Sequence, residues 1–370
     1  RLSPADVAAE QEVPQLVRRA LSHPVGCSPL SEQVRPGLKV LIIVDDITRG
    51  TPTRDIIPVL LEHLADAGCK ERDIRFALAL GTHRPMTDDE IAKKLGPEAA
   101  KQYQVINTPA QQKEAFIDTG ESWGGVPIEV HHSVIESDFV IGIGSVVPHS
   151  DVGWSGGCKI VLPGMCSERT VMENHILCVS FPGNMLGQPT TLIRENMEGV
   201  VKKIGLDYVL NVAMTPYGQV IDICGGHFIG AQRAAVEVSR QIYSVPFVER
   251  ADIVVANAYP GDIDLWQGSK GIWAGEMMVK PGGTVILNAP CYEGIGPHPE
   301  YLDLMGRKPD YILNDVRAGL LEDKNVAGGA WQIAWMLEHI DLVIVSSGLT
   351  EEQFGSGPIA FSPSLQDAVD

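Results

Sequence analysis

The sequence predicts an α/β protein made of two α/β domains with mainly parallel sheets. The run at 38–44, apolar except for Lys39, is typical of a strand that is buried on both faces of a parallel sheet. Strand, polar loop and helix then follow one another repeatedly, and this order starts afresh near residue 246. We therefore expect an N-terminal domain over 1–245 and a C-terminal domain over 246–349, with the tail of about 350–370 as a candidate to pack back on the first.

The individual elements follow from apolar periodicity and from cap and turn residues. A helix is predicted over 4–22 with Ser3 as a candidate cap, and another over 55–67 with Thr51 or Thr53 as its cap. Thr87 and Glu90 predict a capping box that opens a third helix. Further strands are predicted at 73–80, 138–147, 208–213, 219–224, 251–257, 282–288 and 340–345, further helices at 228–243 and 263–273, and a less regular segment at 96–137.

Composition excludes several kinds of partner. The formal net charge of -18 argues against nucleic acid and against an anionic membrane surface, since both require a basic footprint. No apolar run approaches the roughly 18 residues of a membrane span. The seven cysteines are scattered and form no C-x-x-C pair, which favours reduced thiols and a cytoplasmic protein over a disulfide framework or a zinc site.

Three of the predicted strands end in short polar loops. Because parallel strands present their carboxyl ends at one edge of a sheet, these loops predict an active site, which we expect in a crevice between the two domains. The loops deliver Asp46 and Arg49, His83 and Arg84, and His149 and Lys159.

Lys159 follows Ser155-Gly156-Gly157-Cys158, in a segment that continues to His175. A glycine pair lets backbone amides approach a ligand closely, and the lysine after it could pair with phosphate or act as a nucleophile. The spacing fits neither of the common nucleotide-binding fingerprints. A solvated surface lysine is the plainer alternative, and the residues alone leave these readings open.

Histidine recurs beside turn residues at His83, His149 and His175. A lone histidine is most often structural, but two on opposite sides of a substrate could act as paired general bases. Arg49, Arg84 and Lys270 are cations that could hold a carboxylate, with surface solvation as the alternative for each. The pair at 131–132 looks like a solvent-facing loop and is given no role.

Several motifs together resemble the nickel-pincer-nucleotide lactate racemase family. The resemblance covers most of the chain, and the Ser-Gly-Gly-x-Lys element with its flanking histidines is its most specific part. The motifs are Asp46-x-Thr48-Arg49, Gly81-Thr-His83-Arg84, Pro148-His149-x4-Trp154-Ser-Gly-Gly-x-Lys159, Pro163-Gly164, Asn174-His175 and Trp266-Gln267-x-x-Lys270.

The resemblance implies an isomerase that inverts C2 of a small 2-hydroxy acid such as lactate. Its cofactor would be a pyridinium-3-thioamide-5-thiocarboxylic acid mononucleotide carrying Ni(II), attached covalently to Lys159 and completed by His175 as a metal ligand. His83 and His149 would be the acid/base pair while the C2 hydride moves reversibly to the cofactor. By the same resemblance Asp46, Thr48, Gly156 and Gly157 would border the cofactor, and Arg49, Arg84, Trp266, Gln267 and Lys270 the substrate.

Two tryptophans depart from the pattern expected of the family. Trp154 and Trp266 stand where smaller aromatic side chains are expected, so the pocket is expected to differ in shape, and Arg84 could meet the second carboxylate of malate. The cofactor-biosynthesis proteins are expected partners. Two rival functions stay open, a Schiff-base lyase that uses Lys159 and a non-catalytic carrier of the nickel nucleotide.

Overall fold

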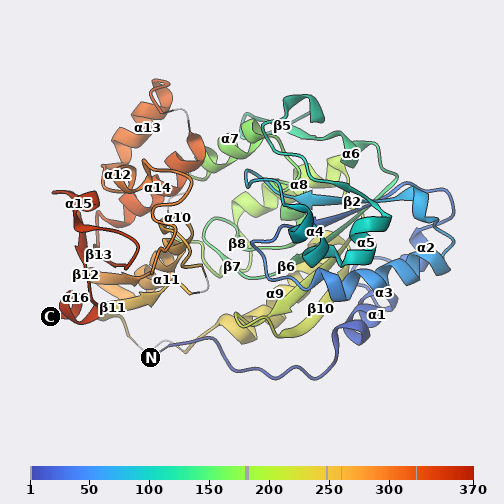
Figure 1. Cartoon of the computed structure of the whole chain (residues 1–370), viewed down its shortest axis with the longest axis horizontal. Helices are drawn as coiled ribbons and strands as arrows, with labels where there is room; N and C mark the ends of the chain where they lie inside the picture. The colour runs from blue at the N-terminus through green and yellow to red at the C-terminus, as the bar shows by residue number, and fades with distance from the viewer. Residues whose placement is uncertain (1, 180–182, 247–248, 260, 322) are drawn as a thin grey trace. The chain divides into compact units, whose positions relative to one another are not determined.

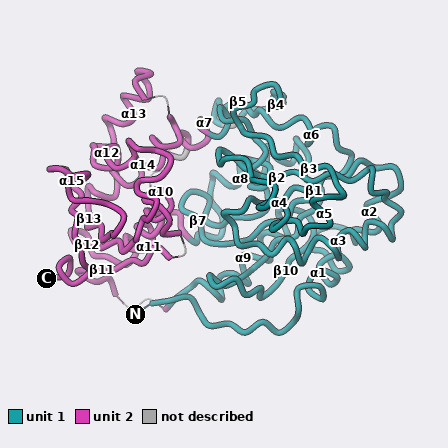
Figure 2. The backbone as a smooth tube through the Cα atoms, viewed as in Figure 1, with its two compact units in different colours: residues 1–171, 187–245 teal, residues 172–186, 246–370 magenta. Residues whose placement is uncertain are grey.

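A computed structural model describes residues 2–179, 183–246, 249–259, 261–321 and 323–370 (Figure 1). The chain divides into two compact units (Figure 2). Unit 1 comprises residues 1–171 and 187–245, and unit 2 comprises 172–186 and 246–370. The predicted α/β fold with mainly parallel sheets is confirmed.

Unit 1 is built on a six-stranded sheet with the order β10-β9-β6-β1-β2-β3. All neighbours pair in parallel except β9 and β10, which are antiparallel. β1 is buried over its whole length, as the apolar run at its first five residues predicts. The strands are β1 (Val40–Asp45), β2 (Ile74–Ala79), β3 (Gln104–Ile106), β6 (Phe139–Ser145), β9 (Tyr208–Met214) and β10 (Val220–Gly226).

Helices and two small ribbons complete unit 1. The main core lies where α1, α3 and α4 pack their apolar faces against alternate strand residues such as Ile42 and Phe76. The helices are α1 (Val13–Ser22), α2 (Leu30–Gln33), α3 (Thr53–Asp66), α4 (Asp88–Leu95), α5 (Pro97–Gln102), α6 (His132–Ile135), α8 (Leu192–Ile204) and α9 (Phe228–Tyr243), with 3-10 turns η1 (Glu71–Asp73), η2 (Lys113–Ala115) and η3 (Gly157–Ile160). The ribbons pair β4 (Phe116–Trp123) with β5 (Val126–His131), and β7 (Pro148–His149) with β8 (Gly153–Trp154).

Unit 2 is built on a four-stranded parallel sheet with the order β11-β12-β13-β14. A separate apolar core joins this sheet to α11, α12 and α14. The strands are β11 (Ala251–Asn257), β12 (Val279–Asn288), β13 (Asp341–Val345) and β14 (Ile359–Ser362). The helices are α10 (Leu265–Gly268), α11 (Lys270–Met278), α12 (Tyr301–Met305), α13 (Pro309–Arg317), α14 (Lys324–Met336), α15 (Glu351–Phe354) and α16 (Leu365–Val369). α7 (Glu168–Cys178) begins in unit 1 and continues into unit 2.

The structure corrects two expectations about the chain ends. The tail belongs to unit 2 rather than to the N-terminal domain, because β14 pairs with β13 in the unit 2 sheet. The first helix begins at Val13 rather than at residue 4. Pro14 occupies its first turn, where the backbone N–H that proline lacks would have no partner within the helix. Within the described residues, no helix combines the length and the apolar character needed to cross a membrane.

Two helix starts test the predicted caps. Thr87 and Glu90 form the predicted capping box at the start of α4. α3 begins without a side-chain cap: the Thr51 hydroxyl donates to Asp45 and the Thr53 hydroxyl to the carbonyl of Lys94, so neither caps the helix. These threonines hold the loop between β1 and α3 instead.

Candidate active site

The neighbouring strands β6, β1 and β2 bring the predicted loops to one edge of the unit 1 sheet. β1 pairs in parallel with both neighbours, which places Val44 beside Ile143 and Asp45 beside Ala79. The carboxyl ends of these strands therefore share an edge. The loops at 46–52 and 80–87 and the segment that follows residue 145 leave the sheet side by side, as the sequence predicts.

Asp46 gathers three hydrogen-bond donors at the end of β1. Its Oδ2 lies 2.5 Å from His83 Nδ1, while its Oδ1 accepts from Thr48 N at 3.0 Å and from Thr48 Oγ1 at 2.5 Å. Burial raises the pKa of Asp46, but the hydrogen bond and charge of His83, the Thr48 hydroxyl and Arg49 outweigh burial and lower it to about 2. The ionised carboxylate keeps the proton of a neutral His83 on Nδ1, so Nε2 is its basic atom.

His149 and Lys159 meet on the segment after β6. His149 Nε2 lies 3.1 Å from Lys159 Nζ, and His149 Nδ1 accepts from the backbone N–H of Asp151 at 3.2 Å. Asp151 Oδ2 lies 3.9 Å from the same Nδ1, so the acidic side chain and the backbone of Asp151 both face this edge of the imidazole. Lys159 reacts with electrophiles in its neutral form, in which the nitrogen keeps its lone pair.

Gly164 joins the Lys159 segment to the loop after β2. A Cβ at this position would lie 2.5 Å from the Ile160 carbonyl oxygen and 2.8 Å from Ala79 Cβ, so only glycine fits between η3 and the end of β2. The Gly164 carbonyl accepts a hydrogen bond from Gly81 N at 3.0 Å. The two predicted site loops are thus held together through the backbone.

Gly156 and Gly157 serve the packing of η3. Both have positive φ, +76° and +60°, and a Cβ would lie 2.5 Å from Val146 Cγ2 at the first position and 3.0 Å from the Gln232 side chain at the second. The Gly157 amide donates to Asn211 Oδ1 at 3.0 Å. This amide is therefore satisfied by the protein, and the cofactor-binding role of the two glycines stays a prediction.

Trp154 belongs to a core rather than to a pocket. Its side chain is 2% exposed among Val146, Ala235 and Val236, and its ring meets Tyr243 edge-on at 6.4 Å between centroids. The expectation that Trp154 reshapes the substrate pocket is wrong, because its side chain is taken up by this small cluster.

A buried ion pair supports the Asp46 loop, and sequence reasoning missed it. Lys94 Nζ lies 2.6 Å from Asp45 Oδ1, and both residues are buried, with 4% and 8% exposure. The same ammonium donates to the Arg49 carbonyl at 2.9 Å and reaches the Thr51 carbonyl at 3.5 Å. The available signal was the position of Lys94 on the apolar face of α4, directly before the buried Leu95.

Lys94→Met is expected to lower the free energy of unfolding by about 3–5 kcal/mol, because it leaves the Asp45 carboxylate buried without its cation. Urea denaturation measures the change. The exposed neighbour Lys93→Met is the matched control and should stay within about 0.5 kcal/mol. A variant that combines Lys94→Met with Asp45→Asn should recover part of the loss, and a Lys94→Met protein as stable as the parent would contradict the prediction.

Two predicted substrate cations already have protein partners. Arg84 donates to both carboxylate oxygens of Glu90, at 2.8 and 2.6 Å, and this bond is the first cause that lowers the pKa of Glu90 to about 2. Arg49 donates to Thr48 Oγ1 at 2.9 Å. Arg49 therefore lies with the Asp46 cluster, whereas Arg84 is tied to the start of α4.

Four predicted residues lie in unit 2. On α7, His175 Nδ1 lies 2.8 Å from Asn325 Oδ1 of α14. Lys270 Nζ donates to Gln267 Oε1 at 2.5 Å, so the structure brings these two predicted substrate groups together. Trp266 precedes them on α10 and meets Tyr301 edge-on at 4.8 Å. Asn325 is a second residue that sequence reasoning missed.

His131 is a structural histidine at the end of β5. It is 3% exposed, with Nε2 3.1 Å from Thr108 Oγ1 and Nδ1 2.8 Å from Ser133 Oγ. The expectation of a solvent-facing loop is wrong here, because the inward face of β5 continues to this residue. Burial, with the charge of His132 next, lowers the pKa of His131 to about 4.

This lowered pKa predicts acid destabilisation in a defined window. The unfolded histidine titrates near 6.5, so between pH 6.5 and 4 the unfolded chain binds the proton more readily than the folded chain. The free energy of unfolding should fall across this window by up to about 3 kcal/mol, with no further loss from His131 below it. Urea denaturation from pH 7 to 4 measures it: His131→Gln should flatten the slope, and an unchanged slope would contradict the assignment.

Two family models match most of this chain. Residues 1–187 match the family described as lactate racemase N-terminal domain, and residues 248–370 match the lactate racemase C-terminal domain. A lactate racemase from Thermoanaerobacterium thermosaccharolyticum is 30% identical over 81% of this chain and 71% of its own length. Another from Lactiplantibacillus plantarum is 28% identical over 98% of this chain and 86% of its own length.

Solved structures give the same result. The lactate racemase apoprotein from Thermoanaerobacterium thermosaccharolyticum superposes with a TM-score of 0.87 at 26% identity, covering 96% of this chain and 86% of that one. A protein from Thermotoga maritima shares the fold with a TM-score of 0.74 at 22% identity, covering 98% and 93%. Since both family domains match in order, the chain belongs to the lactate racemase family, and its predicted class, an isomerase, is confirmed.

Proposed function

We propose that this chain racemises lactate, or a closely related small 2-hydroxy acid, with a nickel-pincer nucleotide attached to Lys159. The observation that carries the proposal is the contact of Lys159 Nζ with His149 Nε2 at 3.1 Å, on the same sheet edge as the pair of Asp46 and His83. Membership of the lactate racemase family supports the reaction and the substrate. A cytoplasmic location and the cofactor-biosynthesis proteins as partners belong to the same proposal.

The two histidines are suited to move the substrate proton. Inversion at C2 has the same chemistry in both directions, so it calls for one base for each enantiomer. His83 is oriented by the Asp46 carboxylate, which also stabilises the imidazolium that forms when Nε2 takes a proton. Arg49, in the same cluster, offers a cation to the substrate carboxylate.

The residues present fit the cofactor. Lys159 Nζ lies within hydrogen-bond distance of His149 Nε2, and an imidazole there can take a proton from the amine, as covalent attachment requires. His175 offers an imidazole nitrogen, a donor that suits Ni(II). When bound, the nickel-pincer nucleotide would supply a reversible acceptor for the C2 hydride. Such an acceptor is needed because the C2–H bond is too weakly acidic for a base alone to break it.

The substrate range is the finer part of the proposal. A dicarboxylic acid such as malate would need Arg84, and Arg84 is engaged with Glu90. We expect Arg84→Ala to leave the ratio of lactate to malate racemisation within about twofold of the parent, because the guanidinium is held by Glu90 and not by the substrate. Chiral chromatography of both acids measures the ratio. A selective loss of malate activity would instead assign Arg84 to the substrate.

The proposed function is tested with protein produced together with the cofactor-biosynthesis proteins. The expected results are an intact-mass adduct, bound nickel, and conversion of each lactate enantiomer to the racemate. Cofactor and nickel without racemisation would indicate a carrier. Trapping of a keto acid on Lys159 by borohydride in nickel-free protein would indicate a Schiff-base lyase.

A further inference from the structure

His175 is held where α7 meets the first turns of α14. His175 Nδ1 lies 2.8 Å from Asn325 Oδ1, and Lys324 forms an ion pair with Glu173, two residues before His175 on α7. A Cβ on Gly328 would lie 2.9 Å from the His175 carbonyl oxygen, so the two helix backbones touch at this histidine. All of these residues belong to unit 2. The position of His175 is thus set by α14.

Asn325 is itself fixed in place. Its side chain is buried, with 5% of the residue exposed, and its backbone N–H donates to Asp323 Oδ1 at 3.0 Å. Asp323 caps α14 by also accepting from Val326 N at 3.3 Å. In this position the side-chain amide of Asn325 presents its oxygen to the imidazole.

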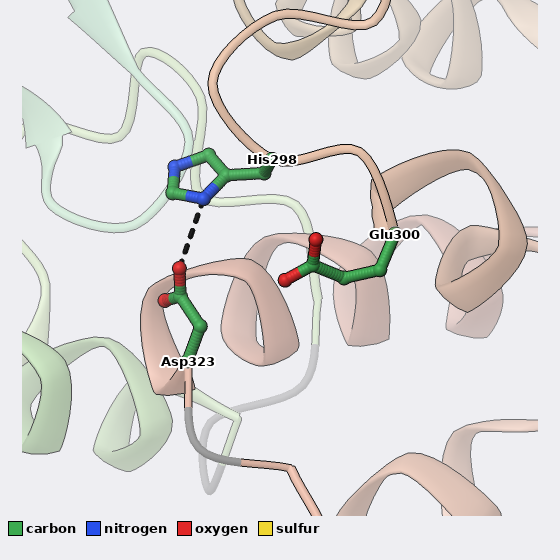
Figure 3. Close-up of side chains that lie close together, drawn as sticks. All are labelled: His298, Glu300 and Asp323. Atoms are coloured by element: carbon green, nitrogen blue, oxygen red, sulfur yellow. Dashed lines mark ion pairs between the residues drawn. The ribbon is translucent and has the colours of Figure 1, made fainter.

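The cap is anchored by His298, whose Nδ1 lies 2.9 Å from Asp323 Oδ2 (Figure 3). The burial and hydrogen bonding of Asp323 have opposite effects: burial raises its pKa, and the hydrogen bond of His298 with those of the helix amides lowers it overall. Glu300 lies near both, and the three could in principle hold a metal ion. Capping and the ion pair already account for both oxygens of Asp323, so we assign this cluster to anchoring α14.

We propose that Asn325 is the positioning residue that selects the tautomer of His175. An amide oxygen only accepts, so it requires the proton of a neutral His175 on Nδ1. The lone pair then lies on Nε2, the nitrogen that becomes the metal donor. The tautomer follows from the contact alone, and its role in nickel binding rests on the proposed function.

Apoprotein labelled with ¹⁵N-histidine tests the tautomer without any cofactor. Long-range ¹H–¹⁵N NMR at a pH where His175 is neutral, assigned with His175→Ala, should show Nδ1 protonated in the parent. Asn325→Asp keeps an acceptor and should keep this tautomer, whereas Asn325→Leu should lose it. The exposed Asn314→Leu on α13 is the matched control. A parent with Nε2 protonated, or an unchanged tautomer in Asn325→Leu, would overturn the proposal.

Nickel retention tests whether the contact of Asn325 with His175 supports metal binding. In protein loaded with cofactor, Asn325→Leu should hold nickel about 10–100-fold more weakly than the parent, as loss of an outer partner of a ligating histidine does. Circular dichroism checks that the variant is folded. Equal nickel retention would overturn the metal-positioning role, whereas a parent that binds no nickel would overturn the proposed function and leave the NMR result standing.

Discussion

Lys159→Arg protein is expected to acquire no covalent adduct and to racemise lactate at least about 10³-fold more slowly than the parent, the scale on which enzymes respond to loss of a reacting group. Arginine keeps the length and charge of the side chain. Its guanidinium, however, stays protonated and has no lone pair to attach to an electrophile. Intact mass and chiral chromatography measure the two effects on the same sample.

The exposed Lys202→Arg on α8 is the matched control, because it makes the same exchange away from the sheet edge. It should carry the full adduct and the parent activity. An adduct of unchanged mass on the Lys159→Arg protein would place the attachment elsewhere and remove the main support for the proposed function. Loss of activity with a retained adduct would mean that Lys159 acts in some other way.

The grouping of the site loops at one edge of the sheet could be predicted, because each strand and loop is marked by residues close together in the sequence. A short apolar run such as 40–44 is typical of a strand buried on both faces, and parallel pairing then brings the loops after β6, β1 and β2 to one edge. The same logic correctly grouped Asp46 with His83. It could not reveal that the carboxylate bonds the imidazole directly, because side-chain partners depend on register and rotamer.

The residues that support the site were hidden because their contacts are long-range. Asn325 bonds a histidine 150 positions earlier in the chain, and no local pattern marks it. The burial of Lys94 was missed for another reason, because a lysine is rarely buried. Only its position on the apolar face of α4 could have indicated the burial. The start of the first helix was predicted too early. Apolar residues before Pro14 continue the helical periodicity, but the helix begins only at Val13.

Asp46→Asn is expected to lower kcat by about 10²–10⁴-fold, the range seen when the carboxylate behind a catalytic histidine is removed. Asp46 accepts from three donors, His83 Nδ1, Thr48 N and Thr48 Oγ1, and uses both oxygens to do so. Asparagine offers one acceptor oxygen and turns an NH2 group toward the remaining donors. Either His83 changes tautomer or the loop opens. Steady-state kinetics and ¹⁵N NMR of His83 distinguish these outcomes.

The division between kcat and KM decides what Asp46 does. If the carboxylate orients His83 for proton transfer, kcat falls and KM changes little, whereas a rise in KM alone would mean that Asp46 acts only in binding. Asp207→Asn is the control at the opposite end of the sheet, since its carboxylate accepts from Val140 N at 2.7 Å and an amide oxygen can do the same. Parent-like kcat in Asp46→Asn, with His83 still protonated on Nδ1, would show that hydrogen-bond geometry alone suffices and that the negative charge is dispensable.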